Sequence, residues 1–173
     1  MSTMAELITD LGTIKRLAQE REQTYVELRA FIKWRLDWDD AKLDGVVREI
    51  ARPIYEAVDC TSCANCCRTM LVGVHPGDTP RLARRLRLSE AEFEKRYLAV
   101  SKEGEKVIAE SPCPFLRGSR CSAYEVRPRD CREFPHLLKG DFRSRSVSTF
   151  TNAADCPIVF NAVERLMPAV GFR

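Results

Sequence analysis

Apolar side chains recur at helical spacing through the first third of the chain. Helical periodicity extends from residue 5 to about residue 57, and between residues 7 and 32 the steps alternate between four and three, which places these positions on one face of a helix. That face comprises Leu7, Leu11, Ile14, Ala18, Arg21, Tyr25, Leu28 and Ile32, with a weak point at Ala18 and a break at Arg21. The pattern predicts a long amphipathic helix.

A second amphipathic helix is predicted directly after the first. Asp39 or Asp40 supplies its N-cap, because a short carboxylate accepts hydrogen bonds from the first turn of a helix. Pro53 is expected to kink or end this helix, since proline has no backbone N–H and its ring clashes with the preceding turn. Its apolar side carries Val46, Val47, Ile50, Ile54 and Val58.

The two helices form a predicted N-terminal arm, residues 1–57, and the sequence leaves two roles open for it. In the first, the arm covers the cysteine domain of its own chain, and Trp34 and Trp38 anchor it there. In the second, the apolar face pairs with a second copy and makes a homodimer, as heptad seams do. The side chains that would form such a dimer are Leu7, Leu11, Ile14, Tyr25 and Leu28.

The predicted elements become short from Cys60 onward. Residues 70–74 and 107–109 have the composition of brief strands, and Gly118 indicates the turn of a small hairpin. Helix starts are marked by Asp78 or Thr79 with Pro80, by the capping box Ser89 with Glu92, by Pro128, and by Cys156 with Pro157. The expected fold is α+β and mostly helical: a small, irregular, metal-stapled domain at residues 58–173 behind the helical arm.

Composition and charge narrow the partners of the chain. It has 173 residues, with 28 basic and 25 acidic side chains and a net charge of +3, so no global field favours nucleic acid. Residues 1–6 lack the basic and apolar stretches of a secretion signal, and no apolar run approaches the ~18 residues that a membrane span needs. We expect a cytoplasmic protein without a nucleic-acid or membrane partner, and eight cysteines in a reducing compartment favour metal over disulfides.

Four of the eight cysteines stand close together as Cys60-x-x-Cys63-x-x-Cys66-Cys67. Clustered thiolates repel one another, and a metal ion, an iron–sulfur cluster or oxidation relieves that repulsion. The spacing of the first three matches the bacterial ferredoxin run, in which a distant cysteine completes a cubane cluster. Cys113 and Cys156 are each followed by proline, and either could bring that closing ligand. The favoured cofactor is a 4Fe-4S cluster on Cys60, Cys63, Cys66 and Cys113; zinc is the alternative, because four thiolates also make a structural zinc site.

The vicinal pair Cys66 and Cys67 predicts separate partners for its two thiols. Adjacent side chains point about 100° apart on a helix, so two neighbouring cysteines rarely reach one ion. The remaining cysteines then allow two four-thiolate sites, or one complete site with additional structural or reactive thiols.

The ordered cysteine pattern resembles the YkgJ-type cysteine-cluster family, whose members are described as zinc- or iron-chelating domain proteins. The resemblance rests on Cys60 to Cys67, on Cys113-Pro-Phe-Leu116, on the run from Cys121 to Pro135 and on Cys156, and covers about residues 60 to 157. It implies a metal or cluster site with eight candidate ligands: Cys60, Cys63, Cys66, Cys67, Cys113, Cys121, Cys131 and Cys156. A similar cysteine cluster occurs in flagellin lysine methylases, which are much longer.

Three functions are compatible with the sequence. The favoured one is a metal-binding protein with an iron–sulfur cluster, acting in redox chemistry or metal handling with an unidentified redox or protein partner. The second is a structural zinc module in a protein-interaction role, and the third is a protein-modifying enzyme related to flagellin lysine methylases. No Ser-His-Asp pattern, Walker loop or dinucleotide fingerprint identifies a catalytic residue, so whether the chain is an enzyme stays open.

Overall fold

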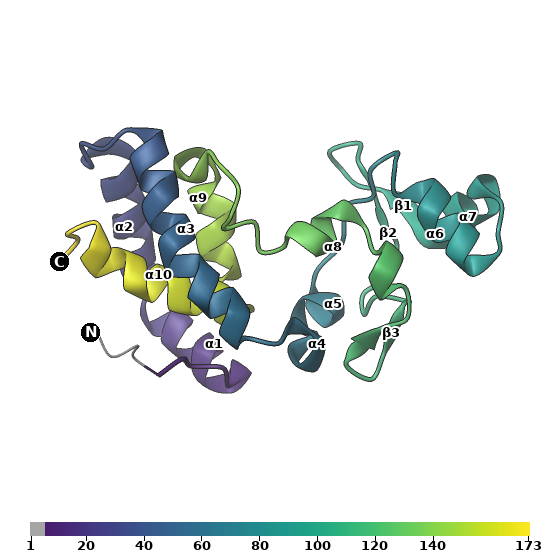
Figure 1. The fold of residues 1–173 in the computed structure, drawn as a ribbon, viewed down its shortest axis with the longest axis horizontal. Helices are drawn as coiled ribbons and strands as arrows, with labels where there is room; N and C mark the ends of the chain where they lie inside the picture. Colours follow the sequence, from purple (N-terminus) through teal and green to yellow (C-terminus); the bar gives the residue numbers. More distant parts are fainter. Residues whose placement is uncertain (1–5) are drawn as a thin grey trace. The chain divides into compact units, whose positions relative to one another are not determined.

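The computed structural model describes residues 6–173, which fall into two compact units. Unit 1 consists of the chain up to Asp59 together with Pro135–Arg173, and unit 2 consists of Cys60–Phe134. Residues 1–5 lie outside the described residues. They begin the predicted arm and make up most of residues 1–6, the segment that lacks the features of a secretion signal. Figure 1 shows the elements of both units along the chain.

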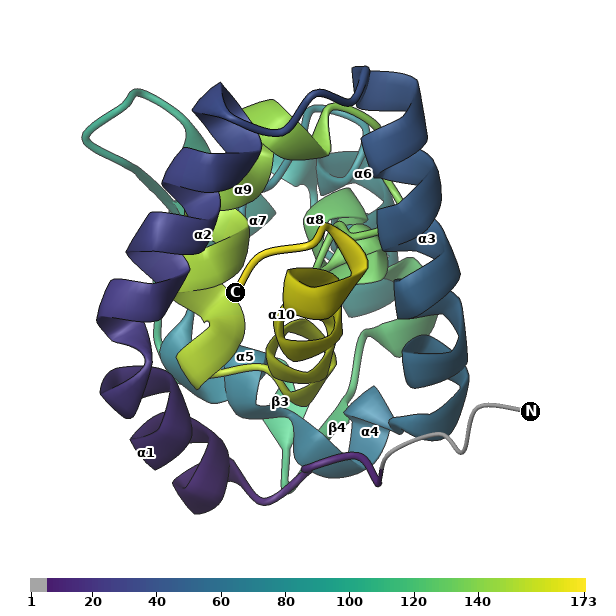
Figure 2. The same cartoon turned by 90° about the vertical axis from the view of Figure 1, so that its left-hand side faces the viewer.

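Unit 1 is a bundle of helices around a buried C-terminal helix. Its elements are α1 (Leu11–Glu20), α2 (Glu22–Trp34), α3 (Asp40–Ala57), α9 (Phe142–Thr151), the 3-10 turn η2 (Asn152–Ala154) and α10 (Pro157–Ala169). Helix α10 contacts α1, α3, α9 and η2, and Figure 2 shows it with α2 and α9 on one side and α3 on the other. Because α10 is enclosed in this way, eight of its side chains between Pro157 and Leu166 are buried.

The C-terminal helices belong with the arm rather than with most of the cysteines. Unit 2 ends at Phe134, and residues 135–173 pack into unit 1. Their apolar side chains give the reason: Ile158, Val159 and Val163 are at most 1 % exposed and complete a core that the arm cannot close alone.

The first predicted helix is interrupted at Arg21, so the expectation of one long helix is wrong. Arg21 has φ −103° and ψ 9°, outside the helical region, and it separates α1 from α2. The guanidinium of Arg21 pairs with the carboxylate of Glu164 in α10. The interruption falls where the apolar seam is broken by a charged residue.

The apolar face of the arm is buried within its own chain. Ile14, Leu28 and Ile32 are fully buried and Tyr25 is 6 % exposed. These side chains therefore pack intramolecularly, within the unit that the arm forms with residues 135–173. Trp34 is not one of the anchors, since it is 76 % exposed with the Lys33 ammonium over its ring.

Helix α3 begins as the sequence predicts. The Asp39 carboxylate accepts a 2.7 Å hydrogen bond from the Lys42 amide and caps the first turn. Pro53 lies inside the helix, which continues to Ala57, so the predicted break does not occur there.

Unit 2 is built from short elements. They are α4 (Cys60–Cys63), α5 (Asn65–Thr69), α6 (Thr79–Leu86), α7 (Glu90–Tyr97), β1 (Leu98–Val100), β2 (Lys106–Ile108), β3 (Leu116–Arg117), β4 (Arg120–Cys121), η1 (Tyr124–Val126) and α8 (Arg129–Glu133). The pairs β1–β2 and β3–β4 form two separate antiparallel sheets. With helices in the majority and two small sheets, the fold is α+β and mostly helical, as predicted.

Local signals in unit 2 fix several of these elements. The Ser89 hydroxyl and the Glu92 carboxylate complete the predicted capping box of α7. Gly118, with φ +65°, makes the turn between β3 and β4. The strand predicted at residues 70–74 is reduced to a single bridge between Gly73 and Val107. A small core made of Val74, Leu82, Ala83, Phe93, Ile108, Phe115 and Ala123 supports the unit.

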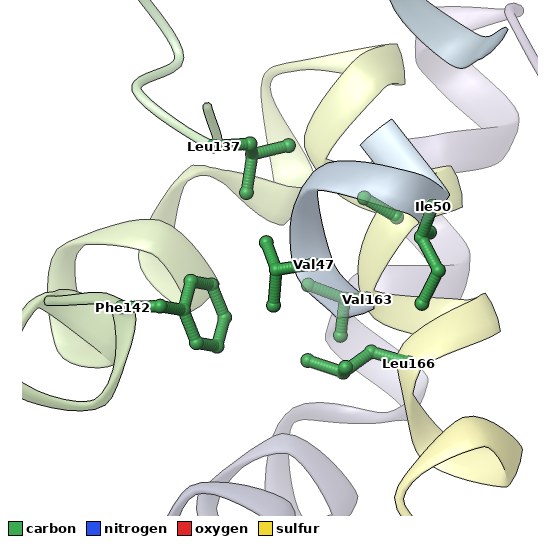
Figure 3. A pocket seen from close by; sticks show the side chains of 7 residues that line it. Val47, Ile50, Leu137, Phe142, Val163 and Leu166 are labelled. Carbon is green, nitrogen blue, oxygen red and sulfur yellow. The ribbon is translucent and has the colours of Figure 1, made fainter. Parts of the chain in front are cut away.

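Among residues 6–173, no helix is both long enough and apolar enough to cross a membrane. Unit 1 contains a cavity of about 10 Å³ whose lining is entirely apolar, including Val47, Phe142 and Val163 (Figure 3). A space of this size is close to the volume of a single water probe. It is a packing gap in the core of unit 1 and does not hold a ligand.

Candidate metal centre

Seven of the eight cysteines lie in unit 2. Cys60 and Cys63 belong to α4, Cys66 and Cys67 to α5, and Cys113, Cys121 and Cys131 to the later segments. Cys156 lies in unit 1, where it is buried as the N-cap residue of α10. All eight carry reduced thiols.

The run from Cys60 to Cys67 is divided by one left-handed residue. Ala64 has φ 49° and ψ 20°, is 3 % exposed, and separates α4 from α5. Arg68 then fixes this arrangement, because its guanidinium donates to the Cys63 carbonyl at 2.7 Å and to the Gly118 carbonyl at 3.2 Å. The arginine therefore joins the first cysteine segment to the β3–β4 hairpin.

A backbone hydrogen bond brings the second cysteine segment beside the first. The Cys113 amide donates to the Cys67 carbonyl at 2.8 Å. The β3–β4 register then places Cys121 opposite Leu116, and α4 contacts β4. Both Cys113 and Cys121 pack against the core of unit 2. The core and the hairpin thus hold these two cysteines near the α4–α5 segment.

Cys131 lies on α8. This helix is anchored by residues 75–78, a third part of unit 2. The Asp78 carboxylate accepts a 3.1 Å hydrogen bond from the Arg129 amide, and the Asp130 carboxylate lies 2.8 Å from Nε2 of His75. These contacts attach the beginning of α8 to residues 75–78.

The electrostatics of the thiols show that four of them lie close together. Burial raises the pKa of Cys131 to about 12, and negative charge on Cys67, Cys113, Cys121 and Asp130 contributes to the rise. Burial is also the first cause that raises the pKa values of Cys113 and Cys121, and each feels the charge of Cys67. Ionising all four thiols together is therefore unfavourable unless a positive charge compensates them.

Cys67 differs from the other three. A hydrogen bond from the Cys66 thiol, which outweighs the opposing effect of burial, lowers the pKa of Cys67 to about 7, and the charge of Arg68 contributes. The thiols of Cys66 and Cys67 are therefore in contact, while the expectation that they serve different partners stays a prediction. The helix that carries them is five residues long, so ideal helical directions do not decide where its thiols lie.

The donor set fits a thiophilic metal. Thiolate sulfur is the ligand that zinc and iron–sulfur clusters take, whereas magnesium and calcium take oxygen. Among residues 6–173, no three His, Cys, Asp or Glu side chains are arranged so that they could hold a metal ion as they stand. The thiols are gathered but do not form a closed coordination shell, so their side chains would have to rearrange around a bound centre.

The predicted cluster ligands overlap only in part with the four cysteines whose charges influence one another, which are Cys67, Cys113, Cys121 and Cys131. Cys113 belongs to both groups, whereas Cys60, Cys63 and Cys66 come only from the ferredoxin-like spacing. The ligand set therefore remains a prediction that separate substitutions can test.

Sequence patterns did not reveal what anchors α8. Asp78 was predicted to cap α6, yet its carboxylate makes no hydrogen bond to the amides of that helix. It instead binds a residue 51 positions away. Gly73, at the isolated bridge, also lies against Asp130, and nothing in the local sequence signals this long-range contact.

A second hollow of the surface lies beside this anchor, within unit 2. Its lining includes His75, Asp130, Glu90, Glu105 and Lys106. Lys106 is already paired with Glu94 at 2.6 Å. The hollow leaves the His75–Asp130 pair about one-third exposed, so this side of α8 faces solvent.

Together, the short elements and the gathered thiols define a cysteine-cluster protein. The family with the signature CxxCxxCC, described as "Putative zinc- or iron-chelating domain", matches residues 59–157. This match covers more than half of the chain, so the chain belongs to that family and the predicted resemblance is confirmed. The family description supports metal chelation by the cysteine-rich segment and leaves zinc and iron as alternatives.

Neither the curated proteins nor the solved structures include a match to this chain.

Proposed function

We propose that Cys67, Cys113, Cys121 and Cys131 bind one metal centre, and that this centre is an iron–sulfur cluster. The observation that carries the proposal is the hydrogen bond from the Cys113 amide to the Cys67 carbonyl, which joins two cysteine segments that are 46 positions apart. The mutual electrostatic influence of the four thiols supports the same grouping. A cationic centre would offset the burial and the mutual repulsion that raise the pKa values of Cys113, Cys121 and Cys131.

Iron–sulfur is favoured over zinc by the number of the thiols. Unit 2 contains seven cysteines, three more than one tetrahedral shell requires. The ferredoxin-like spacing belongs to Cys60, Cys63 and Cys66 and supports a cluster on a different set of ligands. Cys60, Cys63 and Cys66, with Cys113, remain the competing ligand set for the cluster. Zinc is the second candidate, because a unit with so small a core gains folding free energy from a closed four-thiolate site.

The proposed role is in redox chemistry, in the cytoplasm. The partial burial of the site agrees with the redox role. Cys67, Cys113, Cys121 and Cys131 are all half-buried and none is fully enclosed. When bound, an iron–sulfur cluster supplies one-electron transfer, and exposure of its edge is what a partner needs for access. The protein's own part is to hold the thiolates, with Arg68 placed to offset their charge.

The test is metal and sulfide analysis of protein prepared without oxygen. The proposal predicts iron with acid-labile sulfide in comparable amounts. Stoichiometric zinc without sulfide would replace the cluster by the structural zinc module. Protein without either metal after preparation in a medium supplemented with both would contradict metal binding altogether.

A further inference from the structure

Asp78 is a buried carboxylate that joins three segments of unit 2. Only 2 % of the residue is exposed. Its Oδ2 accepts a 3.0 Å hydrogen bond from the His75 amide, and its Oδ1 accepts from the Arg129 amide at 3.1 Å and from the Arg81 guanidinium. A carboxylate buried to this extent is stable only when its oxygens are paired, and here both are.

The position of Asp78 makes these contacts informative. It is the N-cap residue of α6, where an aspartate usually accepts hydrogen bonds from the first turn of its own helix. Its side chain makes no such bond. The carboxylate is aimed instead at the first amide of α8, two residues before Cys131.

A second contact holds the next residue of α8. His75 Nε2 lies 2.8 Å from Oδ1 of Asp130. The backbone at Gly73 passes so close that a Cβ there would overlap Oδ2 of Asp130. Any other residue at position 73 would therefore push Asp130 away.

Helix α8 depends on such anchors because it is only five residues long. An isolated helix of this length does not form in water, since nucleation is unfavourable and few hydrogen bonds repay it. The direction of the Cys131 side chain is consequently set by what holds Arg129 and Asp130.

We propose that Asp78 is a positioning residue for Cys131, with Gly73 and His75 in support. By holding the first turn of α8, it turns the Cys131 thiol toward Cys67, Cys113 and Cys121. This inference rests on the proposed function, in which Cys131 is a metal ligand. Asp78 itself does not touch the metal.

The experiment uses Asp78→Asn in the full chain, with cobalt(II) as the probe. Asparagine keeps the shape of the side chain but places an NH2 group against a backbone N–H or a guanidinium. Thiolate-to-cobalt absorbance per bound cobalt reports how many thiolates coordinate the ion. Loss of one of four thiolates should lower it by about one quarter. In the absence of metal, alkylation of Cys131, followed by mass spectrometry, should become faster in the variant.

The matched control is Glu92→Gln, which removes another carboxylate cap in the same unit. Glu92 accepts from the Ser89 amide at 2.8 Å and has no contact with α8 among the described hydrogen bonds. The control should lose thermal stability while its cobalt absorbance and the alkylation rate of Cys131 stay at the parent values. Gly73→Ala, compared with Gly77→Ala, should repeat the pattern of Asp78→Asn.

Three results would overturn the inference. One is parent-like absorbance and alkylation in Asp78→Asn, and another is an equal loss in Glu92→Gln, which would indicate general unfolding. The third is full absorbance in Cys131→Ser, which would remove Cys131 from the ligands while leaving the metal site itself intact. Absence of thiolate absorbance in the parent would instead refute the proposed function and, with it, the role of Asp78.

Discussion

The amide of Cys113 donates a 2.8 Å hydrogen bond to the carbonyl of Cys67. This contact places the segment that begins the β3–β4 hairpin directly beside the CxxCxxCC run. Because backbone atoms make the bond, it does not depend on the protonation of either thiol. The two cysteine segments are held together by the fold of unit 2.

The first prediction separates the two candidate ligand sets. Cys121→Ser should weaken metal binding by more than about 100-fold, the upper end of the effect of residues that merely support a ligand. Cys60→Ser should leave the affinity close to that of the parent. Competition with a chromophoric chelator measures both affinities. The reverse order, with Cys60→Ser severe and Cys121→Ser mild, would select the ferredoxin-like set instead.

Gly73→Ala should destabilise unit 2 by about 1 kcal/mol, because the added Cβ would displace the Asp130 carboxylate and weaken its contact with His75. Gly77→Ala is the matched control, since no atom lies within 4 Å of a Cβ at that position. Urea unfolding of the two variants gives the comparison. Equal stability would show that Asp130 can move aside without consequence.

Asp44 should be a major stabilising residue of unit 1. It is 8 % exposed and accepts hydrogen bonds of 2.9 Å from the amides of Asp141 and Phe142, at the start of α9. Asp44→Ala leaves both donors without this acceptor and should lower the free energy of unfolding by about 2 kcal/mol. Asp37→Ala, at an exposed position, serves as control. Thermal melts that agree within error for the two variants would contradict this role.

The stability of unit 1 should depend on pH through Tyr25. Burial raises the pKa of Tyr25 to about 12, against a smaller lowering by Arg21, and its hydroxyl donates to Glu164 at 2.7 Å. Since the pKa in the folded state exceeds the value near 10 of the unfolded chain, the unfolded chain loses this proton first. The contribution is fully present below pH 10 and disappears as pH rises toward 12.

Tyr25→Phe isolates this contribution from other groups that titrate at alkaline pH. The free energy of unfolding of the parent should fall more steeply between pH 10 and 12 than that of Tyr25→Phe. Chemical unfolding at several pH values measures the two slopes. Parallel slopes would mean that Tyr25 ionises as readily in the folded protein as in the unfolded chain.

Features determined by neighbouring residues could be predicted from the sequence. The Asp39 cap, the Ser89–Glu92 capping box and the turn at Gly118 each depend on a few adjacent positions, and each is present in the structure. The mostly helical class followed from the same kind of periodicity. The ordered cysteine pattern could also be read from the sequence, and the family match confirms the resemblance that it predicted.

Features determined by distant residues could not be predicted. The helix break at Arg21 is accompanied by a pairing with Glu164, and the weakened strand at Gly73 follows a close approach to Asp130. Asp78 looked like an ordinary cap because its partner Arg129 lies far along the chain. The packing of residues 135–173 with the arm likewise depends on tertiary contacts that local patterns do not contain.

X-ray absorption spectroscopy of the anaerobically prepared parent tests the proposed metal centre most directly. At the iron edge, the account predicts a first shell of sulfur only, with a neighbouring iron atom from the cluster. Cys121→Ser should lose this signal, and Cys60→Ser should keep it. A first shell of nitrogen or oxygen, or an unchanged sulfur shell in Cys121→Ser, would contradict the assignment of Cys67, Cys113, Cys121 and Cys131 as the ligands of an iron–sulfur cluster.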